Sequence, residues 1–191
     1  QVSRAADAAA VMTLTQEVSK KGWIAFAGKS KAGDYDIFVA RPDGSEKRNI
    51  TNTPEFSEVG VRWSNDGKKV MYRKPALAMQ SKLNHDNWGG IGSVIIADAD
   101  GSNPVEFGGK REFPWVCWAP NDTSVSTLYK RAGVIRIYNI ASSEKIGGDM
   151  PRKGIFQQLF MSADGKYFTG TANFSGRDWN VVSYEVASKK V

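Results

Sequence analysis

Short runs of β-branched and aromatic residues, each followed by a polar turn, recur along most of the chain. Segments 37–44 and 94–101 carry such a run into an Asp-Gly turn, and segments 135–142 and 181–188 repeat the run with other turn residues. Runs of β-forming residues that end in Asp-Gly are typical of β-hairpins. The pattern therefore predicts short antiparallel strands that belong to a repeated unit.

A second motif interleaves with the first: an apolar strand ends in Trp or Met, a polar turn follows, and another strand begins. The motif starts at Trp63, Trp118 and Met161, and the longer first spacing contains an insertion at 74–92. A period of about 40–45 residues with four short strands is typical of β-propeller blades. We therefore predict an all-β chain made of four-stranded antiparallel blades, about four of which are present.

The same residues carry a family resemblance. The segments W-S-N-D-G-K-K at 63–69, D-I-F-V-A-R-P-D-G-S at 36–45 and N-I-T-N at 49–52 resemble the repeat of the TolB-like propellers, a family of bacterial periplasmic and secreted proteins. The third unit departs from this repeat, with Ala-Ser-Ser-Glu at 141–144, and Asn121-Asp122 replaces an Asp-Gly turn. The resemblance implies the propeller fold; it implies function only loosely, because this fold hosts many activities.

We divide the chain into an N-terminal arm (1–21), a partial blade 1 (22–53), blade 2 (54–109), blade 3 (110–150) and a partial blade 4 (151–191). With the strands of a blade labelled a to d from the axis outward, blade 1 opens on its b strand and blade 4 ends on its c strand. The ring is therefore expected to be incomplete, closed by a continuation of the chain or, as the alternative, by a second chain. The predicted strands are 23–26, 35–41 and 47–51 in blade 1; 59–63, 69–73, 93–98 and 104–107 in blade 2; 114–118, 125–129, 134–140 and one near Lys145 in blade 3; and 156–161, 166–171 and 180–186 in blade 4.

Two segments outside these strands are open to more than one interpretation. Residues 5–17 are expected to form a short helix or a loose arm over a sheet edge, or residues 11–15 an added strand. Residues 74–82, at the start of the insertion, are expected to form a short helix.

Composition and charge narrow the chemistry. The net charge of +6 favours an acidic partner, and the absence of a nucleic-acid recognition motif argues against nucleic acid. One His and one Cys make a zinc site, a disulfide and Ser-His or Cys-His catalysis poor predictions, so we expect no metal, no cofactor and no catalytic residue. No apolar run is long enough to span a membrane, so any membrane association is expected to go through a partner.

Loop residues of the predicted blades are the candidates for partner binding. The insertion supplies His85, Asp86 and Trp88, the connections between blades supply Lys110, Arg111, Trp115, Arg152 and Lys153, and the b–c loop of blade 4 supplies Arg177 and Trp179. Trp and Arg are enriched at interface hot spots. The alternative for His85 and Trp88 is turn capping and packing, and for Trp115 and Trp179 it is core between blades.

The leading functional hypothesis is a non-catalytic protein-binding scaffold in the periplasm or outside the cell, as a subunit of an envelope-associated assembly. The resemblance to TolB-like propellers implies this role and this location, with the cytoplasm as the alternative location. The competing hypothesis is the propeller part of an enzyme, either a peptidase or a metal-dependent polysaccharide lyase or hydrolase. No G-x-S-x-G motif occurs in the chain, so a peptidase would need its nucleophile elsewhere. A cytosolic tryptophan–aspartate-repeat propeller ranks third, because Trp-Asp strand ends are absent.

Overall fold

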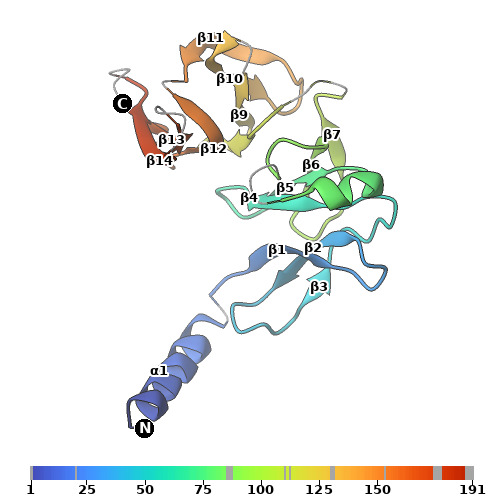
Figure 1. The fold of residues 1–191 in the computed structure, drawn as a ribbon, viewed down its shortest axis with the longest axis vertical. Helices are drawn as coiled ribbons and strands as arrows, with labels where there is room; N and C mark the ends of the chain where they lie inside the picture. The colour runs from blue at the N-terminus through green and yellow to red at the C-terminus, as the bar shows by residue number, and fades with distance from the viewer. Residues whose placement is uncertain are drawn as a thin grey trace.

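The computed structural model describes residues 2–19, 21–84, 88–109, 111, 113–129, 132–152, 154–173 and 178–187. Its strands form four antiparallel sheets, one for each predicted blade (Figure 1). The sheets contain three or four strands and do not close a ring within the described residues. The strands are β1 (Ile24–Lys29), β2 (Tyr35–Ala40) and β3 (Arg48–Asn49) in blade 1; β4 (Val59–Trp63), β5 (Lys69–Lys74), β6 (Ser93–Asp98) and β7 (Val105–Phe107) in blade 2; β8 (Cys117–Trp118), β9 (Ser124–Tyr129), β10 (Val134–Asn139) and β11 (Lys145–Pro151) in blade 3; and β12 (Ile155–Met161), β13 (Tyr167–Ala172) and β14 (Asn180–Glu185) in blade 4.

The predicted strands are confirmed, most of them to within two residues at each end, and the main difference is in blade 3. Its inner strand was predicted over 114–118, but β8 contains only Cys117 and Trp118. Trp115 has a positive φ of 55°, as do Gly60 in β4 (65°) and Gln158 in β12 (54°) at the equivalent positions, but its N–H donates to Gly89 O of the insertion at 2.7 Å. The insertion is therefore bonded to the chain just before β8.

Residues 2–18 form a helix, α1 (Val2–Val18), so the strand considered for 11–15 does not form. Figure 1 shows α1 extending away from blade 1 rather than lying over its sheet. Within the described residues, no helix combines the length and apolarity that crossing a membrane requires.

The core lies between neighbouring blades, because the sheets of blades 2 and 3 are each covered on both faces by the blades beside them. In β5, Val70 and Tyr72 pack with blade 1, while Met71 between them packs with blade 3. Successive side chains of a strand point to opposite faces, so one apolar strand serves two interfaces. A third cluster joins blades 3 and 4 through Leu128 and Phe168, neither of which is exposed. This stacking explains why the strands read as continuous apolar runs.

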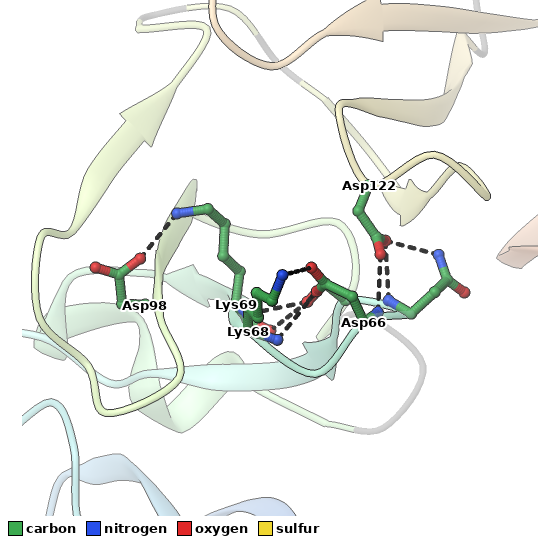
Figure 2. Close-up of polar contacts among 7 residues, drawn as sticks. Asp66, Lys68, Lys69, Asp98 and Asp122 are labelled. Carbon is green, nitrogen blue, oxygen red and sulfur yellow. Dashed lines mark hydrogen bonds and ion pairs between the residues drawn. The ribbon is translucent and has the colours of Figure 1, made fainter.

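Asp122, a residue that departs from the repeat, joins the turns between the a and b strands of blades 2 and 3, here called the inner turns. Asp122 has a φ of 51°, close to that of Gly67 (70°) and Gly165 (72°) at the equivalent turn positions. Its carboxylate accepts hydrogen bonds from Asn65 N (2.8 Å), Asn65 Nδ2 (2.7 Å) and Asp66 N (2.8 Å), as Figure 2 shows. Glycine adopts this backbone region at lower cost than aspartate. The hydrogen bonds of the Asp122 side chain, which glycine lacks, join the two blades.

Candidate functional site

The b–c loops and the connections between blades lie at one end of the blades, here called the loop end, whose described residues are 30–34, 50–58, 75–84, 88–92, 108–109, 111, 113–116, 132–133, 152, 154, 173 and 178–179. The insertion dominates it. Its first half contains a 3₁₀ helix, η1 (Leu77–Lys82), which confirms a short helix here and shows that it is not an α-helix. Gln80 Nε2 donates to Gly33 O at 2.9 Å, and Gln80 Oε1 accepts from Ser57 Oγ at 2.5 Å. The insertion is therefore fixed onto blade 1.

The second half of the insertion is held by Arg73, a buried residue at the end of β5. Its guanidinium donates to Gly92 O at 3.1 Å, to Gly89 O at 2.6 Å and to Phe113 O. Burial, together with the smaller effect of the nearby charge of Arg62, lowers the pKa of Arg73 to about 9. A single side chain thus fastens both the insertion and the connection between blades 2 and 3.

Sequence reasoning missed Arg73, although the strand pattern contained a signal. Arg73 shares a face of β5 with Met71, and Met71 belongs to the core between blades 2 and 3. A charged residue at a core position of an apolar strand requires compensating partners, so it marks a polar structure nearby.

The predicted tryptophans of the insertion and the next connection both pack against the protein. The Trp88 ring lies 6.3 Å from that of Tyr35 in a tilted arrangement, and Trp88 is half-buried. Trp115 is 5 % exposed and belongs to the cluster between blades 3 and 4. Trp115 is therefore core, the alternative that the sequence left open, and burial makes it unsuitable as a contact residue for a partner.

The other described candidates separate into two places. Arg152 N donates to Gly133 O at 3.2 Å, which brings the blade 3–4 connection beside the b–c loop of blade 3. Trp179, 52 % exposed, precedes β14 and stands at the same end of the blades. Arg111 instead donates from Nη2 to Ser143 O at 2.7 Å, in the β10–β11 turn at the far end of blade 3. Its guanidinium therefore does not join Arg152 and Trp179.

His85, Asp86, Lys110, Lys153 and Arg177 lie outside the described residues, so their roles stay predictions.

Buried acids at the seam between blades 1 and 2 serve the fold. Asp36 accepts from Asn49 Nδ2 at 2.6 Å and from Thr51 Oγ1 at 3.2 Å, which ties β2 to β3 and the chain that follows. Glu58 has no exposed surface, and burial raises its pKa to about 7.

No group of three His, Cys, Asp or Glu residues in the described part of the chain has the geometry to hold a metal ion. Burial also raises the pKa of the Cys117 thiol to about 12, so this thiol is inert in the folded protein.

A cavity of about 120 Å³ lies beneath the insertion. Arg62 from β4 and Arg73 from β5 line it, together with Tyr72, Trp88 and Trp115. Arg62 Nη1 donates to Leu159 O of blade 4 at 2.7 Å, and its guanidinium lies 4.1 Å from the centre of the Phe160 ring. Two basic and three aromatic residues thus line the cavity.

Comparison with known proteins supports the fold. No protein-family model matches the sequence, and no curated relative matches it. Among solved structures, a putative TolB from Agrobacterium tumefaciens is similar over 88 % of this chain and 59 % of its own, with a TM-score of 0.61 and 14 % identity. The chain has the fold of a TolB-like β-propeller.

Two further solved structures with different names are also similar to this chain. A puromycin hydrolase matches 88 % of this chain with a TM-score of 0.55 and 16 % identity, and this chain covers 26 % of it. A structure of a nidogen/laminin complex matches the same share with a TM-score of 0.55 and 15 % identity, and 57 % of that chain is covered. The chain therefore spans less than two thirds of each neighbour's length. At these identities the likeness establishes the fold alone.

Proposed function

We propose that this chain is a protein-binding scaffold, a propeller that presents its loop end to a partner in the bacterial envelope. The observation that carries the proposal is the exposure of large apolar side chains there: Trp179 is 52 % exposed on the b–c loop of blade 4, and Leu77 is 41 % exposed on that of blade 2. Loops on a rigid scaffold are common sites of binding, and tryptophan is enriched in interface hot spots.

Charge indicates the kind of partner. The chain carries a net charge of +6, and Arg152 stands at the loop end, where the exposed Trp179 also lies. A basic surface attracts acidic partners and makes the rate of association depend on salt. We therefore expect a partner with an acidic contact surface, bound through a few aromatic anchors and steered by charge.

Paired substitutions at opposite ends of the blades test this proposal. The double variant Arg152→Glu/Trp179→Ala changes the loop end, and Lys68→Glu changes an exposed lysine in the inner turn of blade 2 as the control. The immobilised proteins are exposed to an extract of the source cells at low and high salt. We expect the double variant to lose the proteins that the wild type retains at low salt, while the control keeps them. Retention of the same proteins by the double variant, with circular dichroism unchanged, would refute the loop end as the binding surface.

A peptidase-associated propeller is the second candidate, supported by the similarity to the puromycin hydrolase, of which this chain covers 26 %. In this role the blades would adjoin a separate catalytic domain. An assay for hydrolysis of an aminoacyl amide by the intact protein isolated from its source discriminates between the two. A mass well above 20.9 kDa, with hydrolysis of an aminoacyl amide, favours the peptidase. The absence of hydrolysis favours the scaffold.

A further inference from the structure

Arg62 and Arg73 together form an unusual feature beneath the insertion, because both of these basic residues line one small cavity. They come from the adjacent strands β4 and β5, and the cavity measures about 120 Å³. None of the described residues that line it is acidic. Neither arginine forms an ion pair within the described part of the chain. Among the described residues, therefore, two like charges lie beside one cavity without a counter-charge.

The two arginines differ in how far the protein satisfies them. Arg73 makes three hydrogen bonds to carbonyl oxygens, so its position is fixed. Arg62 makes one, from Nη1 to Leu159 O, among the described residues. A guanidinium has five N–H donors, so most of those on Arg62 are left for a ligand or for water. Arg73 therefore supplies a rigid positive wall, and Arg62 supplies donors.

The energetics favour an anion in this space. Burial lowers the pKa of Arg62, and both burial and the charge of Arg62 lower that of Arg73. Since arginine keeps its proton in proteins, a bound counter-ion, rather than loss of a proton, would offset the cost of burying these two charges. A water molecule occupies roughly 30 Å³ in the liquid, so the cavity has room for a group of a few heavy atoms.

We propose that the cavity beneath the insertion is a binding site for a small oxyanion, held by Arg62 and oriented by Arg73. Planar guanidinium groups pair with carboxylate and phosphate oxygens in bidentate fashion, and such a contact is stronger beside apolar and aromatic side chains than in bulk water. Because Arg73 also holds Gly89 and Gly92, the bound anion stabilises the insertion. The site does not depend on the protein-binding role proposed above.

Thermal unfolding of the full chain with added anions tests the site. Acetate, inorganic phosphate and a tetraglutamate peptide are titrated separately, each against chloride at equal ionic strength. We expect a saturable rise in Tm with at least one of them, since a ligand that binds only the folded state stabilises it by mass action. A larger effect of acetate or phosphate identifies the free ion that fits best. A larger effect of the peptide indicates a carboxylate carried by a polypeptide.

Variants of Arg62 decide whether the effect comes from this cavity. Arg62→Gln removes the charge and most donors, and we expect it to weaken binding at least about tenfold. Arg62→Lys keeps the charge and is expected to bind with intermediate affinity, while Lys68→Gln, a surface change, binds as the wild type does. The proposal is overturned if no anion exceeds chloride, or if Arg62→Gln responds as the wild type does. Direct calorimetric titration of the folded variants gives the same comparison without relying on their stability.

Discussion

The buried carboxyl of Glu58 predicts a specific dependence of stability on pH. Glu58 lies at the seam between blades 1 and 2, where its backbone N–H donates to Tyr35 O at 2.6 Å. Thr53 Oγ1 donates to its Oε1, and Oε2 has no hydrogen-bond partner among the described residues. The charged and titratable groups near it are Asp36 on β2 and Lys74 and Tyr72 on β5.

Burial is the main cause of the raised pKa of Glu58, about 7 against an ordinary 4.5, and the negative charge of Asp36 adds to it. The hydrogen bond from Thr53 and the charge of Lys74 oppose the shift. Between these two pKa values the folded protein holds a proton that the unfolded chain has lost. Stability therefore falls as pH rises from about 4.5 to about 7, and the shift corresponds to about 3 kcal/mol.

The change that isolates this term is Glu58→Gln, which imitates the protonated carboxyl at every pH. We expect the stability of the variant minus that of the wild type to increase by about 3 kcal/mol between pH 5 and pH 8. The absolute difference contains a constant contribution from the amide group of Gln, so the slope is the measured quantity. Urea unfolding followed by fluorescence of the six tryptophans gives the free energies of unfolding at each pH.

The control is Glu55→Gln, three residues earlier, where the side chain is exposed. This variant is expected to follow the wild type across the same pH range. A difference between Glu58→Gln and the wild type that is constant with pH would show that Glu58 titrates like an exposed carboxyl. The argument from its burial would then be wrong.

Two further predictions concern the contacts between blades. Asp122→Gly keeps a residue suited to the φ of 51° but removes the acceptor for three hydrogen bonds. We therefore expect the free energy of unfolding in urea to fall by about 1–2 kcal/mol, and to fall further for Asp122→Ala. A glycine variant as stable as the wild type would show that these hydrogen bonds do not stabilise the contact between blades 2 and 3. Gly89→Ala places a methyl group 2.1 Å from Trp115 Cε3 and is expected to destabilise the protein by about 2–3 kcal/mol. The control Gly148→Ala, whose new methyl group has no atom within 4 Å, is expected to leave the urea midpoint nearly unchanged. Equal midpoints for the two variants would show that the insertion does not pack on Trp115.

Local sequence determined the strands and their order, because a strand that is covered on both faces needs a run of β-forming apolar residues, and a tight turn needs residues that accept unusual backbone angles. The two segments with Asp-Gly turns were recognisable for this reason. The third unit forms its turn without Asp-Gly: Ser143 adopts a φ of 56°, and Asn139 Oδ1 accepts from Ser142 N at 3.0 Å. Residues that mimic a turn through their side chains therefore preserved the repeat.

The sequence also singled out the insertion, because it interrupts a regular period, but its contacts depend on residues far apart in the chain. Gln80 contacts Gly33, and Arg73 contacts Phe113, forty residues away. No local pattern encodes such pairs. In the same way, the sequence places both Trp115 and Trp179 in loops and does not distinguish them, yet Trp115 is 5 % exposed and Trp179 is 52 % exposed.

The sequence by itself determined the repeated blades, the antiparallel pairing and the net positive charge, all of which follow from residue type and spacing. Only the tertiary structure decided which loop residues reach solvent, which acid loses its hydration, and which two arginines line one cavity. These properties depend on how neighbouring blades stack, since burial and the sum of nearby charges are set by residues from several blades at once.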